Sequence, residues 1–146
     1  MTDLEIETLP ENIQDLISDF EFLEDWEDRY MHVIDMGKAL PPLEPALKTE
    51  ATKVKGCVSQ VWLVSETDGN VNPRLTFRGD SDAHIVKGLV AIVLEIFSNR
   101  TASEISALNA KEILAKLGLS EHLSPQRSNG LQAMVSRIKA EATDRD

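Results

Sequence analysis

The stretch VSQVWLVSETDGNVNPRLTFRGD, residues 58–80, contains two runs rich in β-branched and apolar residues, with a turn signal between them. The signal is the DG pair at 68–69, because glycine tolerates the left-handed backbone that tight hairpin turns need. Pro73 cannot donate a ladder hydrogen bond, so we expect the second strand to begin at Arg74 or to lie at an edge of the sheet. With the preceding run TKVKG, residues 52–56, as a further strand, this region predicts a three-stranded antiparallel meander.

Two helices are predicted before the sheet. Residues 10–20 carry apolar side chains at helical spacing, and Pro10 stands where a first helical residue is expected. Residues 23–37 repeat the pattern, with Gly37 as the expected stop, and the prolines at 41–42 forbid continuation. Each helix therefore has one apolar face.

Further helices are predicted after the sheet. Residues 80–99 are apolar on nearly every helical face, which indicates a buried helix, and Asp80 or Ser81 is the expected N-cap. Later helices are expected from a capping box at Thr101 and Glu104, from Asn109 to Leu117 with a stop at Gly118, and from Ser124-Pro125 to about Ala142. The fold class is therefore α+β: one domain over residues 1–146, with a small three-stranded antiparallel sheet packed against helices.

The composition argues against several classes of protein. Hydrophobic residues make up 42% and charged residues 27% of the chain, as in ordinary soluble domains. Twenty-five acidic and fifteen basic residues leave a net charge of -10, which argues against a nucleic-acid partner and favours a basic protein surface. The most apolar window, residues 85–97, is too short to span a membrane, and the acidic amino terminus does not resemble a signal peptide. We expect no membrane association, and because the single cysteine favours a reducing compartment, we expect a location in the cytoplasm or an equivalent organelle matrix.

Cys57 is the only cysteine, which excludes an intrachain disulfide and any cluster site built from several thiolates of one chain. Gly56 permits a tight bend that puts Cys57 near a loop tip, and Lys53 and Lys55 favour the nucleophilic thiolate. A buried filler is the other interpretation, because free cysteine is among the most buried residue types and apolar residues follow it. From position alone, the two interpretations are evenly balanced.

The histidines and carboxylates give weaker signals. His84, near a helix start, is the best general-base candidate of the three histidines, but a cysteine–histidine pair needs a hydrogen bond that sequence alone neither supplies nor excludes. Four carboxylates could suggest a metal site: Glu66, Asp68, Asp80 and Asp82. Their spacing matches no calcium-binding loop, and helix capping and turn formation explain them, so we expect no metal site there.

Arg127 lies in the polar stretch SPQRSNG, residues 124–130, at an expected helix start. Backbone N–H groups are free at such a start, so an anion can bind there, although helix capping explains the stretch as well. The chain contains no Gly-rich phosphate loop and no HExxH, CxxC or nucleophile-elbow pattern.

Separated parts of the chain carry a combined pattern: LPP at 40–42, KVKGCVSQVWL at 53–63, DSDAHIVKGLVAI at 80–92 and HLSPQRSNGLQAM at 122–134. In order and spacing they resemble the SufE family, SufE/CsdE-like sulfur acceptors that work with cysteine desulfurases in iron-sulfur cluster assembly. The resemblance extends over about residues 8–140, which is nearly the whole chain.

The resemblance implies a fold shared in outline with IscU-type scaffold proteins, and it gives Cys57 a function. The family cysteine accepts sulfur from the persulfide of a SufS/CsdA-type desulfurase, which it activates, and passes it to an iron-sulfur scaffold complex. Pyridoxal phosphate belongs to the desulfurase, so no cofactor is implied for this chain. Val58 departs from the family pattern, where many relatives carry Gln. Supporting positions that match are Gly56, Gln60, Asp82, His84 and Arg127.

Other functions remain open at this level. An iron-sulfur scaffold-like protein is one, although a single cysteine argues against it. A small cysteine hydrolase or thiotransferase that pairs Cys57 with a histidine is another, and a purely structural partner with a buried cysteine is a third. Whether a sulfur acceptor counts as an enzyme in its own right is a matter of definition, since it hands sulfur between two macromolecules.

Overall fold

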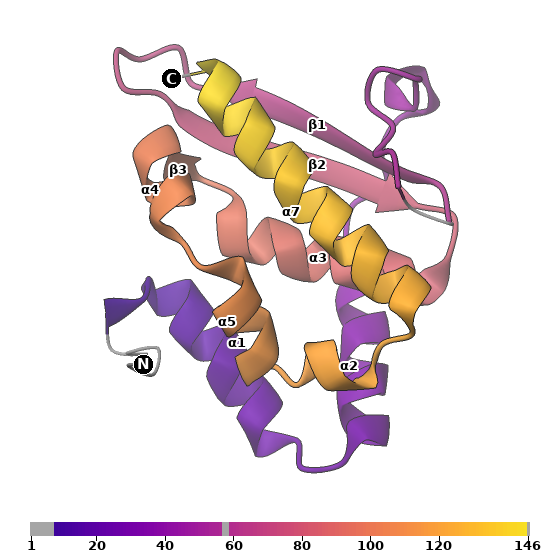
Figure 1. The fold of residues 1–146 in the computed structure, drawn as a ribbon. Helices are drawn as coiled ribbons and strands as arrows, with labels where there is room; N and C mark the ends of the chain where they lie inside the picture. The colour runs from indigo at the N-terminus through magenta and orange to yellow at the C-terminus, as the bar shows by residue number, and fades with distance from the viewer. Residues whose placement is uncertain (1–7, 57–58, 146) are drawn as a thin grey trace.

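The structure is a computed structural model that describes residues 8–56 and 59–145 (Figure 1). In chain order its elements are α1 (Glu11–Phe22), α2 (Trp26–Ala39), the 3-10 helix η2 (Pro45–Leu47), β1 (Val61–Thr67), β2 (Arg74–Ser81), α3 (His84–Phe97), β3 (Arg100–Thr101), α4 (Ala102–Ala107), α5 (Ala110–Lys116), α6 (Leu119–His122) and α7 (Pro125–Arg145). The strands form one antiparallel sheet in the order β1-β2-β3. The predicted α+β class, a small three-stranded antiparallel sheet packed against helices, is confirmed.

The hairpin predicted from residues 58–80 forms between β1 and β2. Its register pairs Val61 with Ser81 at one end and Thr67 with Leu75 at the other. The turn is held by Asp68, whose Oδ1 accepts hydrogen bonds from the backbone N–H groups of Asn70 and Arg74. Because a side-chain acceptor of this kind organises a turn, the DG signal and the strand start after Pro73 are both confirmed.

The predicted first strand, residues 52–56, is wrong as a strand. Lys53 forms only an isolated bridge with Trp62, and the third strand is instead β3, which follows α3 and pairs with Arg74 and Leu75. After α3, the left-handed residue Asn99 turns the chain back to the sheet, and its N–H donates to the carbonyl of Leu75. Two residues of β3 thereby occupy the edge of β2.

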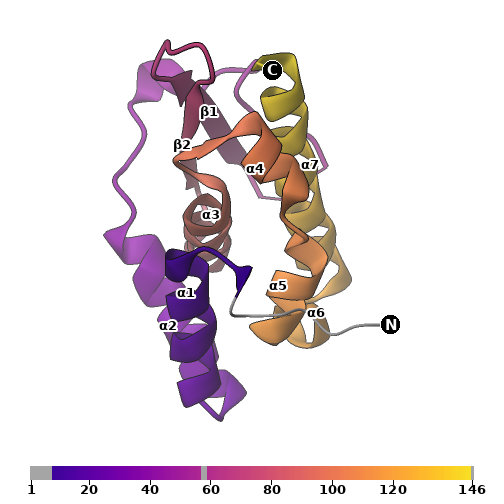
Figure 2. The ribbon, with the colours of Figure 1, turned by 90° about the vertical axis from the view of Figure 1, so that its left-hand side faces the viewer.

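Helix α3 is the centre of the molecule, with α2 on one side and α7 on the other (Figure 2). Eleven of its fourteen residues are buried, as the all-round apolar pattern predicts. The predicted start is wrong, because β2 continues through Asp80 and Ser81, and Ala83 is the N-cap. The two polar residues are buried at the end of the strand instead of capping the helix.

Gly37 does not end α2, contrary to the prediction, but lies inside the helix at its crossing with α3. A Cβ added to Gly37 would lie 2.7 Å from the backbone nitrogen of Gly88, and one added to Gly88 would clash with the carbonyl oxygen of Val33. Neither position has room for a real side chain, so the two glycines allow the helix backbones to approach closely.

The carboxyl-terminal helices begin where their capping residues predict. Thr101 and Glu104 form a reciprocal capping box at α4, and Asn109 caps α5. Gly118 ends α5 in the left-handed conformation, after which α6 is a helix that the sequence pattern did not predict. Ser124 Oγ accepts a hydrogen bond from the N–H of Arg127, which caps the start of α7.

Candidate functional site

The segments on the two sides of the single cysteine are hydrogen-bonded to each other. The N–H of Val54 donates to the carbonyl of Val61 at 2.8 Å, and that of Leu63 donates to Thr52 at 2.8 Å. We call residues 55–60 the cysteine loop. Cys57 and Val58 lie outside the described residues, so their flanking residues define the site.

Gly56 adopts the backbone conformation that the sequence predicts for a tight bend. Its φ of +92° is one that residues with a side chain rarely adopt. The residue is exposed, and a Cβ built on it would lie 3.4 Å from the Cβ of Ala133 in α7. Gly56 therefore turns the cysteine loop at a point where it lies against α7.

Asp82 and Gln60 join the end of the cysteine loop to the start of α3. The Oδ1 of Asp82 accepts a hydrogen bond from the N–H of Gln60 at 3.1 Å, and the N–H of Asp82 donates to the carbonyl of Gln60 at 3.3 Å. Ser81 Oγ also donates to that carbonyl, at 2.8 Å. The two predicted site residues Gln60 and Asp82 thus meet, through backbone groups of Gln60.

Arg137 joins the other end of the loop to α7. Its Nη2 donates to the carbonyl of Ala51 at 2.6 Å and its Nη1 to that of Lys53 at 3.1 Å. Glu141, one turn later, pairs with the Nε of Arg137 at 3.0 Å and fixes the direction of the guanidinium. Sequence reasoning missed Arg137, because no local motif marks an arginine whose partners are distant backbone carbonyls.

A cavity of about 430 Å³ opens beside the cysteine loop between α3 and the start of α7. Ser59, two positions after the cysteine, lines it together with Arg127. Its other lining residues are Val86, Leu89, Ser124, Gln126, Gly130 and Met134. The cavity therefore combines an apolar wall with one cationic side chain, next to the loop that carries the only thiol.

Arg127 was predicted as an anion-binding candidate, and the structure brings it to the same cavity as Ser59. The apolar wall was missed. Val86, Leu89 and Met134 are apolar residues at helical spacing, which in a sequence is the pattern of ordinary core positions. In the structure all three are indeed nearly fully buried. Only their location at the open end of α3 and α7 distinguishes them from the rest of the core.

His84 is the first residue of α3 and is exposed, and it does not line this cavity. Lys55 is also exposed, and its ammonium group pairs with the carboxylate of Glu50 at 3.0 Å. The hydrogen bond and the charge of Lys55 hold the pKa of Glu50 below its ordinary value. Since Glu50 offsets its charge, Lys55 is a weaker source of thiolate stabilisation than the sequence suggests.

Asp80 is a buried carboxylate at the end of β2 beside the cysteine loop. Its oxygens accept hydrogen bonds from the N–H groups of Leu43 at 3.1 Å and Ser81 at 2.8 Å, and they contact Lys48 at 3.3 Å and Lys87 at 3.4 Å. Burial alone raises the pKa of Asp80, but these hydrogen bonds and the lysine charges together hold it below the ordinary value. Asp80 thereby ties Leu43, the residue after the LPP segment, to the sheet.

The remaining carboxylates of the predicted group have partners within the chain. Asp68 organises the hairpin turn, and Glu66 pairs with Arg78 at 3.6 Å. Within residues 8–56 and 59–145, no group of three or more His, Cys, Asp or Glu side chains is arranged to hold a metal ion. Over the same residues, no helix has both the length and the apolar character needed to cross a membrane.

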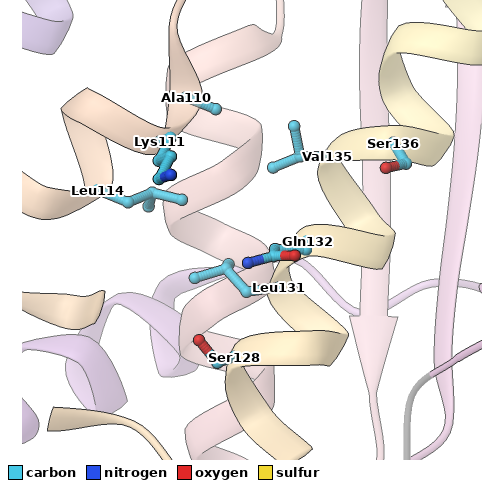
Figure 3. Close-up of a pocket in the computed structure, with 8 residues that line it drawn as sticks. All are labelled: Ala110, Lys111, Leu114, Ser128, Leu131, Gln132, Val135 and Ser136. Carbon is cyan, nitrogen blue, oxygen red and sulfur yellow. The ribbon is translucent and has the colours of Figure 1, made fainter. Parts of the chain in front are cut away.

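A second cavity, of about 340 Å³, lies on the other flank of α7 (Figure 3). Lys111 and Leu114 of α5 face Leu131, Gln132 and Val135 of α7 across it. It shares no lining residue with the cavity beside Ser59. We choose the Ser59 cavity as the candidate site, because it lies beside the loop that contains the only cysteine.

Comparison with known proteins identifies the family of the chain. The profile of the family described as SufE, Fe-S metabolism associated domain, matches residues 14–142. An uncharacterized SufE-like protein of Rhizobium etli is 59% identical over 132 residues, which cover 90% of this chain and 89% of that protein. Another, of Rhizobium meliloti, is 55% identical over 135 residues, covering 92% of this chain and 96% of that protein.

The fold also has a counterpart among solved structures. The solution structure of a hypothetical protein from Thermus thermophilus superimposes with a TM-score of 0.75 and covers 94% of this chain and 97% of its own. At 19% identity, that similarity concerns the fold alone. The family profile covers most of the chain and the relatives match nearly their whole length, so this chain belongs to the SufE family, which is associated with Fe-S metabolism.

Proposed function

We propose that Cys57 accepts a sulfane sulfur from a SufS/CsdA-type cysteine desulfurase and passes it to an iron-sulfur scaffold complex. The observation that carries the proposal is the cavity lined by Ser59 and Arg127, beside the loop that holds the only thiol of the chain. Membership in a family associated with Fe-S metabolism supports the same chemistry.

The transfer is a thiol–persulfide exchange. The thiolate of Cys57 attacks the terminal sulfur of the desulfurase persulfide, a new S–S bond forms at Cys57, and the old S–S bond breaks. The donor cysteine leaves as a thiolate, so no external oxidant or reductant is needed. A second exchange, in which an acceptor thiolate attacks the terminal sulfur on Cys57, completes the transport.

The surroundings of the loop support both protection and release of the sulfur. Two residues span about 7 Å, so a persulfide at position 57 is within reach of the cavity that Ser59 lines. The apolar wall of Val86, Leu89 and Met134 would keep water and oxidants from the sulfur. The guanidinium of Arg127 would stabilise the negative charge of a thiolate or persulfide there.

Anchors at both ends suit this use. Arg137 holds the segment before the cysteine and Asp82 the segment after it, so only the short loop between them has to move toward a partner. A scaffold role is less compatible, because cluster ligation needs several thiolates and this chain has one cysteine.

Stimulation of a desulfurase tests the proposal. A pyridoxal-phosphate cysteine desulfurase is supplied with cysteine, and sulfide release in the presence of a reductant is measured with and without this chain. We expect the wild type to raise the turnover rate and Cys57→Ser to leave it at the basal level. Arg74→Ala, which removes an exposed arginine of the far hairpin end, is the matched control and should stimulate like the wild type. Equal stimulation by Cys57→Ser would overturn the proposal.

A further inference from the structure

The tip of the α1–α2 hairpin carries apolar side chains that the core does not cover. Phe22, the last residue of α1, is 85% exposed, and Met31 of α2 is 52% exposed. Met31 lines a shallow surface pocket of about 440 Å³ together with Trp26, Glu27 and Tyr30. We call these four residues the tip patch. Figures 1 and 2 show this hairpin end projecting away from the sheet. Exposed apolar clusters of this kind mark interaction surfaces.

The same hairpin is strongly acidic. Residues 11–39 contain nine acidic and two basic residues, which account for most of the net charge of -10. Glu27 and Asp35 lie four residues before and after Met31, so both carboxylates flank it on the helix surface, and both residues are exposed. The apolar side chain of Met31 therefore lies between two negatively charged carboxylates.

These charges are not neutralised within the described part of the chain. Among the ion pairs found in residues 8–56 and 59–145, none includes an acidic residue of α1, α2 or the turn between them. Arg29, the nearest cation in sequence, donates instead to the backbone carbonyls of Leu23 at 2.6 Å and Leu117 at 3.2 Å. The negative potential of the tip is thus available to a partner.

The aromatic residues of the patch are held in a fixed arrangement. The ring of Trp26 stacks on that of His122 at 4.5 Å with an interplanar angle of 15°, and it lies 6.3 Å from the ring of Tyr30. Preset aromatic rings bordered by carboxylates suit a guanidinium, which stacks on an aromatic face and pairs with carboxylates at its edge. Lysine lacks the planar group that stacks in this way.

We propose that the tip patch is a docking surface for a basic protein segment that presents arginine beside an apolar side chain. Charge complementarity selects this occupant. Nucleic acid and anionic lipid carry the same sign of charge as the tip, and a second copy of this chain would bring a like-charged surface. The patch shares no lining residue with the Ser59 cavity, so the proposal does not rest on sulfur transfer.

A designed peptide tests the proposal. The probe is a synthetic amphipathic helix of about 14 residues with arginines on one face and leucines on the other. Trp62→Phe leaves Trp26 as the only tryptophan, so its emission reports binding at the patch. We expect saturable binding that weakens as salt rises from about 0.05 to about 0.5 M, because surface ion pairs are screened. Probes with glutamates for arginines, or serines for leucines, should not bind.

Variants locate the surface. Glu27→Lys combined with Met31→Ser should weaken binding by about tenfold or more, which is about 1.4 kcal/mol. Asp15→Lys, the same charge reversal on an exposed position in the middle of α1, should weaken it less than about twofold. Cys57→Ala should bind like the wild type, which separates this proposal from sulfur transfer. Equal weakening by Asp15→Lys, equal binding of the glutamate probe, or concentration-dependent self-association through the patch without probe binding would each overturn the proposal.

Discussion

Asp82 is joined to the backbone of Gln60 by two hydrogen bonds: its Oδ1 accepts one from the N–H of Gln60, and its own N–H donates one to the carbonyl of Gln60. The contact joins the last residue of the cysteine loop to the residues that precede α3. It fixes one end of the segment that, in the proposed function, presents a sulfur first to a donor and then to an acceptor. Loss of this contact should therefore affect sulfur transfer more than it affects stability.

Asp82→Ala tests that expectation. Removing the acceptor costs about 1 kcal/mol of stability, because Asp82 is exposed and water can replace it. We expect sulfur loading from a desulfurase to slow by about tenfold, since a loop without its anchor samples many unproductive positions. Time-resolved intact mass measures the loading. Asp82→Asn keeps the Oδ1 acceptor and should recover most of the rate.

Asp68→Ala is the control for Asp82. Asp68 is also an exposed aspartate whose side chain accepts backbone hydrogen bonds, but it lies in the turn at the other end of the hairpin. Its loss should cost similar stability and leave the loading rate unchanged. If both variants load sulfur at the wild-type rate, Asp82 has no part in positioning the loop.

Gly56→Ala and Gly69→Ala form a second matched pair. Both glycines have a positive φ, +92° and +76°, so an alanine at either position is strained by about 1–2 kcal/mol. A Cβ at position 56 would also contact Ala133, whereas one at position 69 would have no atom within 4 Å. We expect comparable losses in denaturant midpoint, with slower sulfur acceptance only in Gly56→Ala. Unimpaired acceptance there would mean that the bend is not needed.

Arg127 is expected to stabilise charge on the transferred sulfur. Arg127→Ala should lower the rate of sulfur acceptance by about tenfold, and Arg127→Lys should recover part of it by keeping the positive charge. The distinguishing readout is the pH dependence of Cys57 alkylation. Because a nearby cation favours the thiolate, Arg127→Ala should shift the alkylation profile to higher pH. An unchanged profile together with a reduced rate would assign Arg127 to partner binding instead.

The lowered pKa of Asp80 should make the stability of the fold depend on pH. Its pKa is lower in the folded chain than in the unfolded one, so the fold gains stability above the unfolded value of about 3.9 and loses it as pH falls through the folded value. Asp80→Asn should be less stable at neutral pH by about 1–3 kcal/mol, since it leaves Lys48 and Lys87 without their carboxylate. Its free energy of unfolding should then fall less steeply between about pH 5 and 2 than that of the wild type. Parallel profiles for the two proteins would rule out Asp80 as the source of the acid sensitivity.

Local signals predicted the elements that depend on neighbours in sequence. The hairpin turn at Asp68, the capping box at Thr101 and the cap at Asn109 each involve groups within a few residues, and the structure confirms all of them. Where distant segments decide, prediction failed. Gly37 resembles a helix stop until α3 is seen to cross it, and β3 exists only because the chain returns to the edge of β2.

The candidate site divides in the same way. The cysteine loop, its glycine bend and Arg127 could be found in the sequence, because a lone cysteine after a glycine and a polar helix start are local patterns. The anchoring role of Arg137 and the apolar wall around Met134 depend on packing between α7 and distant segments. Such contacts leave no mark in a single sequence.

The most direct test of the central claim is the mass of the chain after incubation with a cysteine desulfurase and cysteine, without reductant. We predict one additional sulfur atom on the wild type, located on the peptide that contains Cys57 and removed by dithiothreitol. Cys57→Ala should carry none, while Arg74→Ala should carry the same amount as the wild type. Sulfur retained on Cys57→Ala, or an unmodified wild type beside a desulfurase that is itself persulfidated, would contradict the account.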